Sequence, residues 1–199
     1  MNSEETKNYW SQRYQEGRTG WDLGSPSTPL KTYIDQLTDK NLKILIPGAG
    51  NAYEAAYLWE EGFTNVYVLD ISENPLQEFQ QRHPDFPAEQ LLCEDFFEHQ
   101  GSYDLILEQT FFCSFPPFPE TRQQYAKQMA DLLKPNGKLA GLWFDFPLTD
   151  DVTNPPFGGS KEEYVPYFEP YFTVKTLEKA YNSIAPRAGR ELFGIFVKS

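Results

Sequence analysis

Two apolar runs separated by a glycine-bearing turn constrain this chain more than any other feature. Residues 42–46 and 65–69 are short and rich in residues that favour strands, and each is followed by a loop and a helical pattern. Between them, residues 52–61 place apolar side chains at helical spacing, and Gly62 is a typical helix stop. This order predicts a strand, a helix and a second strand of a parallel sheet.

The rest of the chain continues the alternation of helices and strands. We expect further helices at residues 75–82, 120–133 and 161–168, and further strands at residues 90–93, 103–109, 138–144, 172–177 and 192–198. The segment Lys134-Pro135-Asn136-Gly137 predicts a turn before the fifth strand. The last two strands have no helix between them, which predicts a closing antiparallel hairpin. Residues 4–37 predict one or two helices outside the sheet.

Length and charge limit the number of domains and the classes of partner. A chain of 199 residues with 40% hydrophobic content predicts one domain over residues 1–199, of which residues 1–38 form a separate N-terminal segment. The formal net charge is -12 and the pI is near 4.6. Such a charge repels phosphate backbones, so we expect no nucleic-acid partner.

The sequence also predicts a cytoplasmic location and no membrane partner. No stretch approaches the about 20 consecutive apolar residues that a membrane helix needs, and the acidic, polar start is unlike a signal peptide. The two cysteines, Cys93 and Cys113, belong to different predicted elements, so they support neither a disulfide framework nor a cysteine metal site. We expect no bound metal.

The turn after the first strand is a candidate ligand site. Gly48 and Gly50 lie where a strand ends and a helix begins, and glycines there let the backbone approach a ligand closely. Asp70 ends the second strand twenty residues after Gly50, the spacing at which an acid reaches ribose hydroxyls. The alternative is a tight turn with nothing bound.

A nucleoside without pyrophosphate fits this turn better than a dinucleotide. The third glycine of the dinucleotide pattern is replaced by Tyr53, and Glu54 at the helix start would repel a dianion. After the third strand, Asp95 and Phe96 offer an acid for an adenine amino group and a ring to cover the base. The same residues also fit a capped turn with a core phenylalanine.

Short motifs run in order along nearly the whole chain. They are Trp10-Ser11-Gln12-Arg13-Tyr14, Thr19-Gly20-Trp21-Asp22-Leu23-Gly24, Ile46-Pro47-Gly48-Ala49-Gly50, Leu69-Asp70-Ile71-Ser72, Glu94-Asp95-Phe96-Phe97, Tyr103-Asp104-Leu105-Ile106, Phe111-Phe112-Cys113, Leu132-Leu133-Lys134-Pro135-Asn136-Gly137, Pro155-Pro156-Phe157 and Ser183-Ile184-Ala185-Pro186-Arg187. In this arrangement the chain resembles the family of thiopurine, thiol and halide methyltransferases, and its plant halide/thiol branch most closely. The N-terminal block from Trp10 to Gly24 is the most specific part of the resemblance.

The resemblance implies an α/β fold of the Rossmann-type class I methyltransferase kind, with a seven-stranded, mostly parallel sheet, a terminal antiparallel hairpin and an N-terminal helical lid. It implies S-adenosylmethionine as cofactor, held by Trp10, Tyr14, Trp21, Pro47, Gly48, Gly50, Asp70, Ile71, Asp95, Phe96 and Gln109. The three aromatic residues would close over the cofactor, Asp70 would hold the ribose, and Asp95 and Phe96 would bracket adenine. Some thiopurine enzymes carry arginine where this chain has Gln109, which disfavours a thiopurine substrate.

The acceptor side is predicted from aromatic residues and one cation. We expect a substrate pocket formed by Phe112, Phe146, Phe157 and Arg187, although a single phenylalanine is more often part of the core. Arg187 would attract an anionic nucleophile, or it is a solvent-facing loop residue. Cys113 is predicted to be a small buried hydrophobe.

The sequence therefore predicts a methyltransferase that acts on a small, soft nucleophile such as a thiol, hydrosulfide, halide or thiopurine-like molecule. No general base is evident, because His83 and His99 lie away from the motifs and are expected at the surface. The alternatives are a methyltransferase of nucleic acid or protein, and a non-catalytic S-adenosylmethionine-binding protein. Asn154-Pro155-Pro156-Phe157 imitates an adenine methyltransferase motif, but it follows the fifth strand instead of the fourth.

Overall fold

In the computed structural model, which describes residues 2–149 and 151–199, seven strands form one sheet. The strands are β1 (Ile44–Pro47), β2 (Val66–Asp70), β3 (Leu91–Cys93), β4 (Tyr103–Gln109), β5 (Leu133–Phe144), β6 (Phe172–Lys179) and β7 (Glu191–Lys198). Their order is β3-β2-β1-β4-β5-β7-β6, parallel from β3 to β5 and antiparallel where β7 pairs with β5 and β6. The predicted fold class, with its terminal hairpin, is confirmed.

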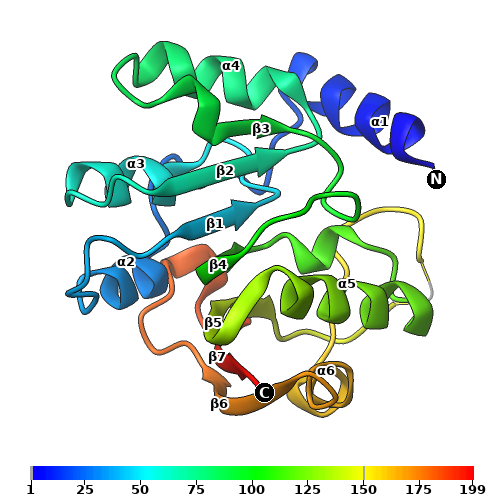
Figure 1. Cartoon of the computed structure of the whole chain (residues 1–199). Helices are drawn as coiled ribbons and strands as arrows, with labels where there is room; N and C mark the ends of the chain where they lie inside the picture. The colour runs from blue at the N-terminus through cyan, green and yellow to red at the C-terminus, as the bar shows by residue number, and fades with distance from the viewer. Residues whose placement is uncertain (1, 150) are drawn as a thin grey trace.

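Helices cover both faces of the sheet (Figure 1). They are α1 (Ser3–Gln15), α2 (Thr28–Ile34), α3 (Tyr53–Glu60), α4 (Glu73–Arg82), α5 (Pro119–Asp131) and α6 (Lys161–Phe168), with short 3-10 helices η1 (Ala88–Gln90), η2 (Phe112–Ser114) and η3 (Ala185–Arg187). Helices α2, α3 and α4 pack on one face, and α5 and α6 on the other. Within the described residues, no helix is both long enough and apolar enough to span a membrane.

The N-terminal segment forms two helices outside the sheet, as predicted. The Asn2 side chain accepts a hydrogen bond from the backbone of Glu5, and the Glu5 carboxylate accepts one from the backbone of Asn2, so the first turn of α1 is closed by a capping box. No residue of α1 is buried, and the helix lies beside α4 (Figure 1). Helix α1 therefore contributes little to the core and is free to serve as a cover.

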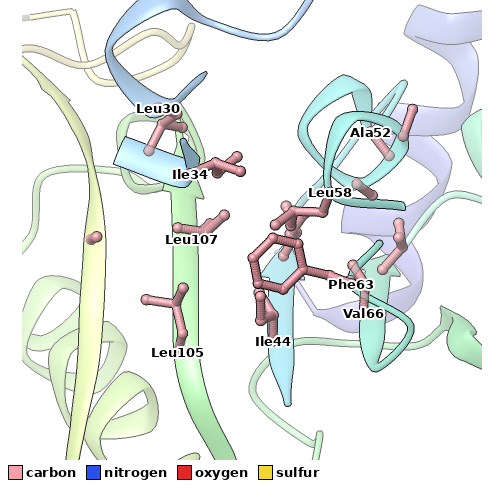
Figure 2. Packing of buried hydrophobic residues seen from close by; sticks show 14 of the residues in the cluster. Leu30, Ile34, Ile44, Ala52, Leu58, Phe63, Val66, Leu105 and Leu107 are labelled. Atoms are coloured by element: carbon pink, nitrogen blue, oxygen red, sulfur yellow. The ribbon is translucent and has the colours of Figure 1, made fainter. Parts of the chain in front are cut away.

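The core on the first face is mainly aliphatic, and Phe63 is one of its few aromatic side chains. Figure 2 shows Phe63 directed toward Ile44 of β1 and Val66 of β2, while Leu30 of α2 faces Leu107 of β4. All five side chains are fully buried. This packing holds β1, β2 and β4 together, and the carboxyl ends of these strands carry the predicted site.

The core on the opposite face is aromatic. Phe168 of α6 stacks on Phe196 of β7 with ring centroids 4.6 Å apart, and Trp143 of β5 meets both rings edge-on. Tyr125 of α5 and Phe112 of η2 extend the cluster toward β4. Aromatic side chains bury large areas, so this cluster fixes the closing hairpin against α5 and α6.

The predicted turn before the fifth strand lies within β5 instead. Tyr103 of β4 pairs with Leu133, whereas Leu105 pairs with Lys138, so the intervening turn residues form an irregularity in a strand that is paired on both sides of it. Asn136 adopts a left-handed conformation with φ 62°, which asparagine tolerates better than most residues. The turn chemistry was predicted correctly, but the pairing of Leu133 with β4 depends on tertiary contacts.

Replacing Phe168 tests the aromatic core. Because the Phe168 side chain is fully buried against Phe196 and Trp143, Phe168→Ala is expected to lower the free energy of unfolding by roughly 3–5 kcal/mol. The control is Tyr181→Ala, whose side chain is 88% exposed and whose loss should change stability by less than about 0.5 kcal/mol. Urea unfolding of both variants measures the difference, and equal effects would contradict this packing.

Candidate functional site

A large cavity lies at the carboxyl ends of β1, β2 and β4. Its volume is about 900 Å³, near the upper end of the roughly 300–1,000 Å³ typical of small-molecule sites. Gly48 and Gly50 line it after β1, Asp70 lines it at the end of β2, and Gln109 lines it at the end of β4. Two ligands of moderate size can therefore occupy it together.

The bend after β1 requires glycine at two positions. Gly48 and Gly50 have φ values of 56° and 54°, in the left-handed region. A β-carbon on Gly48 would lie 1.9 Å from the Phe111 ring, and one on Gly50 would lie 2.8 Å from the Tyr14 hydroxyl. The backbone is thus exposed to the cavity in a shape that no other residue can adopt without displacing its neighbours.

Asp70 connects this bend to the end of β2. Its carboxylate accepts hydrogen bonds from the backbone N–H of Gly50 at 2.9 Å and of Ser72 at 2.8 Å. Burial raises the pKa of Asp70 to about 6, and the two backbone hydrogen bonds oppose that rise. At neutral pH the side chain is therefore mainly a carboxylate, which accepts hydrogen bonds from hydroxyl groups.

The N-terminal segment covers the cavity with aromatic rings. Trp21 meets Trp10 and Tyr14 edge-on, with ring centroids 5.4 and 5.7 Å away. The Tyr14 hydroxyl and the Trp21 indole both lie over Gly50. Burial raises the pKa of Tyr14 far above its usual range, so the hydroxyl stays neutral. Below, residues 1–38 are called the lid.

The end of β3 brings a second acid and a ring to the cavity. Asp95 lines the cavity while its carboxylate accepts a hydrogen bond from the backbone N–H of Phe97 at 2.9 Å. Phe96 is almost fully buried and meets Phe111 edge-on at 5.2 Å. The turn is therefore capped, and Asp95 and Phe96 also line the cavity.

Glu108, a residue that no sequence motif singled out, shapes the loop after β4. Its buried carboxylate accepts hydrogen bonds from the backbone N–H of Phe111 at 2.7 Å and of Phe112 at 2.8 Å, and its second oxygen has no partner. Thr110 in this loop has φ 55°, a strained conformation for a β-branched residue. The sequence feature that could have indicated a buried role for Glu108 is its position directly after the apolar run 105–107.

The opposite wall of the cavity carries aromatic rings and arginines. Phe146 and Phe157 line it, and Phe157 is fixed by a backbone hydrogen bond to Cys113 at 2.8 Å. Arg187 and Arg190 also line this wall, with guanidinium groups 5.3 Å from the Phe144 ring centroid and 4.8 Å from the Phe146 ring centroid, respectively. This wall suits an acceptor that is partly apolar and carries negative charge.

The structure brings most of the predicted site residues together. Those that line the cavity are Trp10, Tyr14, Trp21, Gly48, Gly50, Asp70, Ile71, Asp95, Phe96, Gln109, Phe146, Phe157 and Arg187. Pro47 is buried at the end of β1 and does not reach the cavity wall. Phe112 lies in the aromatic core against Tyr125 and Tyr164, because the left-handed Thr110 turns the neighbouring Phe111 toward the cavity in its place.

The structure decides between the two environments left open for Arg187 and corrects the one expected for His99. Arg187 does not face solvent, since its residue exposure is only 8%. His99 is not a surface residue: it is buried, with one ring nitrogen 2.8 Å from Glu94 and the other 2.8 Å from the Tyr103 hydroxyl. In the part of the chain that the structure describes, no histidine lines the cavity and no group of acids, cysteines and histidines is arranged to hold a metal ion.

The model of the thiopurine S-methyltransferase family matches residues 5–198. The chain belongs to this family. It is 31% identical to a probable thiol methyltransferase 2 of Arabidopsis thaliana, over 99% of this chain and 88% of that relative, and 32% identical to thiocyanate methyltransferase 1 of Brassica oleracea, over 95% and 84%. A thiopurine S-methyltransferase of Nitrosospira multiformis is 24% identical over 87% of this chain and 86% of that relative. The family predicted from the sequence is confirmed.

Solved structures share the fold. A 1,6-didemethyltoxoflavin-N1-methyltransferase of Burkholderia thailandensis, with bound S-adenosylhomocysteine, aligns with a TM-score of 0.77 at 18% identity, over 98% of this chain and 87% of that chain. Magnesium protoporphyrin IX methyltransferase of Synechocystis, also with S-adenosylhomocysteine, aligns with a TM-score of 0.74 at 15% identity, over all of both chains. The fold is that of a class I methyltransferase.

Glu108 predicts an unusual pH dependence of stability. Burial, and then the charge of Glu191, raise the pKa of Glu108 to about 8, whereas an unfolded glutamate titrates near about 4.3. Its contribution to stability is complete below the unfolded pKa and is lost as pH rises through the folded pKa. Glu108→Gln still accepts both backbone hydrogen bonds, so it should lack this loss and gain on the order of a few kcal/mol relative to wild type between pH 5 and 8.

Urea unfolding of both proteins at pH 5, 6, 7 and 8 measures this effect. The expected result is a stability difference that grows with pH. Parallel stability curves over this range would show that burial does not raise the pKa of Glu108.

Proposed function

We propose that this chain is an S-adenosylmethionine-dependent methyltransferase that methylates a small, soft, anionic nucleophile, with thiolates as the leading acceptor class. The observation that carries this proposal is the position of Asp70. Its buried carboxylate faces the cavity beside the Gly48–Gly50 bend, directly beneath the aromatic lid. Residues 1–199 act as one domain in this proposal, and the lid is part of its site.

The residues in place fit S-adenosylmethionine. Asp70 would accept hydrogen bonds from ribose hydroxyls, Asp95 and Phe96 would contact adenine, and Gly48 would lie along the methionine part. A dinucleotide fits poorly, because the Glu54 carboxylate is buried at the start of α3, where a pyrophosphate would need positive potential. The family relationship supports the same choice of cofactor.

The chain's own residues bring donor and acceptor together and exclude water. S-adenosylmethionine supplies, when bound, a methyl group on a positively charged sulfur. The rings of Trp10, Tyr14 and Trp21 favour a cation beneath them and shield it from solvent. Orientation of two reactants in such a site contributes roughly 7–11 kcal/mol in well-aligned cases. Proximity and desolvation are therefore the main contributions of the protein.

The acceptor must bring its own reactive lone pair. Thiolates, thiocyanate and halides do so without a base, and no histidine lines the described cavity to act as one. The cations that face the cavity are Arg13, Arg187 and Arg190, in a chain whose formal net charge is -12. Among these, the exposed Arg190 offers positive charge to a small anion, whereas the acidic chain as a whole disfavours nucleic acid.

We also propose a cytoplasmic location, in line with two free cysteines.

Asp70→Ala tests the donor site. Loss of a charged hydrogen-bond acceptor for the ribose should weaken the binding of S-adenosylmethionine by about 1.5–3 kcal/mol, measured by calorimetry at pH 7.5. Asp131→Ala, an exposed acid of α5 paired with Lys127, is the control and should bind normally. An unchanged dissociation constant in a folded Asp70→Ala protein would remove Asp70 from the site.

An acceptor screen tests the reaction. Iodide, thiocyanate, hydrosulfide, aromatic thiols and thiopurines are incubated with S-adenosylmethionine, and S-adenosylhomocysteine is measured. We expect turnover with thiolates and faster rates as more of the thiol is ionised, because no histidine lines the described cavity to deprotonate a thiol. Binding of the donor without turnover on any acceptor would favour a non-catalytic protein, and turnover only on DNA, RNA or peptide would favour the macromolecular alternative.

A further inference from the structure

Arg187 joins two parts of the chain that are far apart in sequence. It ends η3, on the acceptor wall, and its Nη2 donates a hydrogen bond of 2.8 Å to the backbone carbonyl of Trp21 in the lid. Its Nη1 donates one of 3.1 Å to the Glu191 carboxylate of β7. The guanidinium is thus held by the sheet on one side and holds the lid on the other.

The charge of Arg187 is already balanced. The side chains of Arg187 and Glu191 are 9% and 3% exposed, so their ion pair is weakly screened by solvent. A second buried carboxylate, Glu54, lies close enough for the Arg187 charge to lower its pKa, against the larger rise caused by burial. A guanidinium neutralised in this way attracts an incoming anion much less than a free one does.

Few other bonds fasten this part of the lid. Helix α1 has no fully buried residue, so only the half-buried rings of its inner face, among them Trp10 and Tyr14, hold it by apolar contact. In the described chain, the segment around Trp21 is also tied by Asp22, which accepts hydrogen bonds from the Asn51 amide and, at 3.3 Å, from the Tyr53 hydroxyl. Ser27 adds a third tie, because its N–H donates to Glu54 at 2.9 Å. The bond from Arg187 is the one among these that reaches across the cavity from the acceptor wall.

We propose that Arg187 is a positioning residue for donor binding: it latches the lid at Trp21, and it is not the group that receives the anionic acceptor. With the latch in place, the Trp21 ring stays over Gly50 and against Trp10 and Tyr14, where the donor's cationic sulfur is expected. This inference rests on the proposed donor site, and it assigns to the C-terminal loop a role in holding the donor.

Arg190 provides a matched comparison within the same loop. It also lines the cavity, but its guanidinium lies over the Phe146 ring at 4.8 Å, and it makes no side-chain hydrogen bond to the lid among the described residues. Arg190 is exposed and its charge is available to an acceptor. The two arginines therefore have different roles: Arg187 acts on the donor side and Arg190 on the acceptor side.

The test compares Arg187→Met with Arg190→Met by calorimetry with S-adenosylhomocysteine and no acceptor. We expect Arg187→Met to weaken binding by on the order of ten- to a hundredfold, because a hydrogen bond from a charged donor is lost from the closed lid. Arg190→Met should bind within about twofold of wild type and instead raise the KM of a thiolate acceptor. Limited trypsin digestion after Arg18, without ligand, should be faster in Arg187→Met only.

Two further variants separate positioning from folding. Arg187→Met/Glu191→Gln removes both charges and leaves no buried unpaired carboxylate at this pair, and Arg187→Lys keeps the charge but lacks the fork that reaches both partners. Both should retain near-ultraviolet circular dichroism and still show faster lid cleavage and weaker S-adenosylhomocysteine binding. If folded variants keep wild-type donor binding and cleavage while only the acceptor KM rises, the latch is overturned and Arg187 is an acceptor residue.

A different result would contradict the proposed function itself. Wild-type protein that does not bind S-adenosylhomocysteine would remove the donor site. The digestion of the unliganded Arg187 and Arg190 variants would still report whether Arg187 holds the lid.

Discussion

The pair of hydrogen bonds to the Asp70 carboxylate is the constraint on which the site depends. Burying a carboxylate is unfavourable unless its oxygens are hydrogen-bonded, and Asp70 meets this condition with the backbone N–H groups of Gly50 and Ser72. The same bonds fix the left-handed bend after β1 against the end of β2, where the parallel register already brings Pro47 beside Leu69. One side chain therefore both shapes the backbone that a ligand approaches and presents charge to that ligand.

Buried carboxyl groups perform the same structural task at three places around the cavity. Asp70 holds the bend after β1, Glu108 holds the loop after β4 through the N–H groups of Phe111 and Phe112, and Glu54 holds the lid through the N–H of Ser27. Each carboxylate satisfies backbone donors in loops that lack regular partners. Loops tied in this way keep a defined shape without filling the cavity with apolar side chains, which leaves room for ligands.

The sequence was sufficient for the sheet, the glycine bend, the place of Asp70 and the N-terminal helices, because each rests on a local pattern or on spacing along the chain. It was not sufficient where a side chain's direction depends on tertiary structure. Phe111 and Phe112 are adjacent and chemically identical, and only the left-handed Thr110 and the Glu108 hydrogen bonds decide which ring enters the cavity. Burial of Arg187 likewise depends on a carbonyl 166 residues away. His99 is buried by Tyr103, whose hydroxyl it contacts across a turn.

The outer part of the lid, from α1 to Trp21, combines an aromatic surface with few attachments, whereas α2 at the other end of the lid is anchored in the core. This combination suits the reaction. A donor enclosed between Trp21 and the glycine bend must enter before each turnover and leave after it, so a lid held by extensive apolar burial would slow release. Helix α1 buries no residue, and polar contacts fasten the segment that follows it. Such contacts exchange readily with water when the lid opens and re-form when it closes. Attachment by hydrogen bonds therefore allows the site to be dry while it is occupied and open between turnovers.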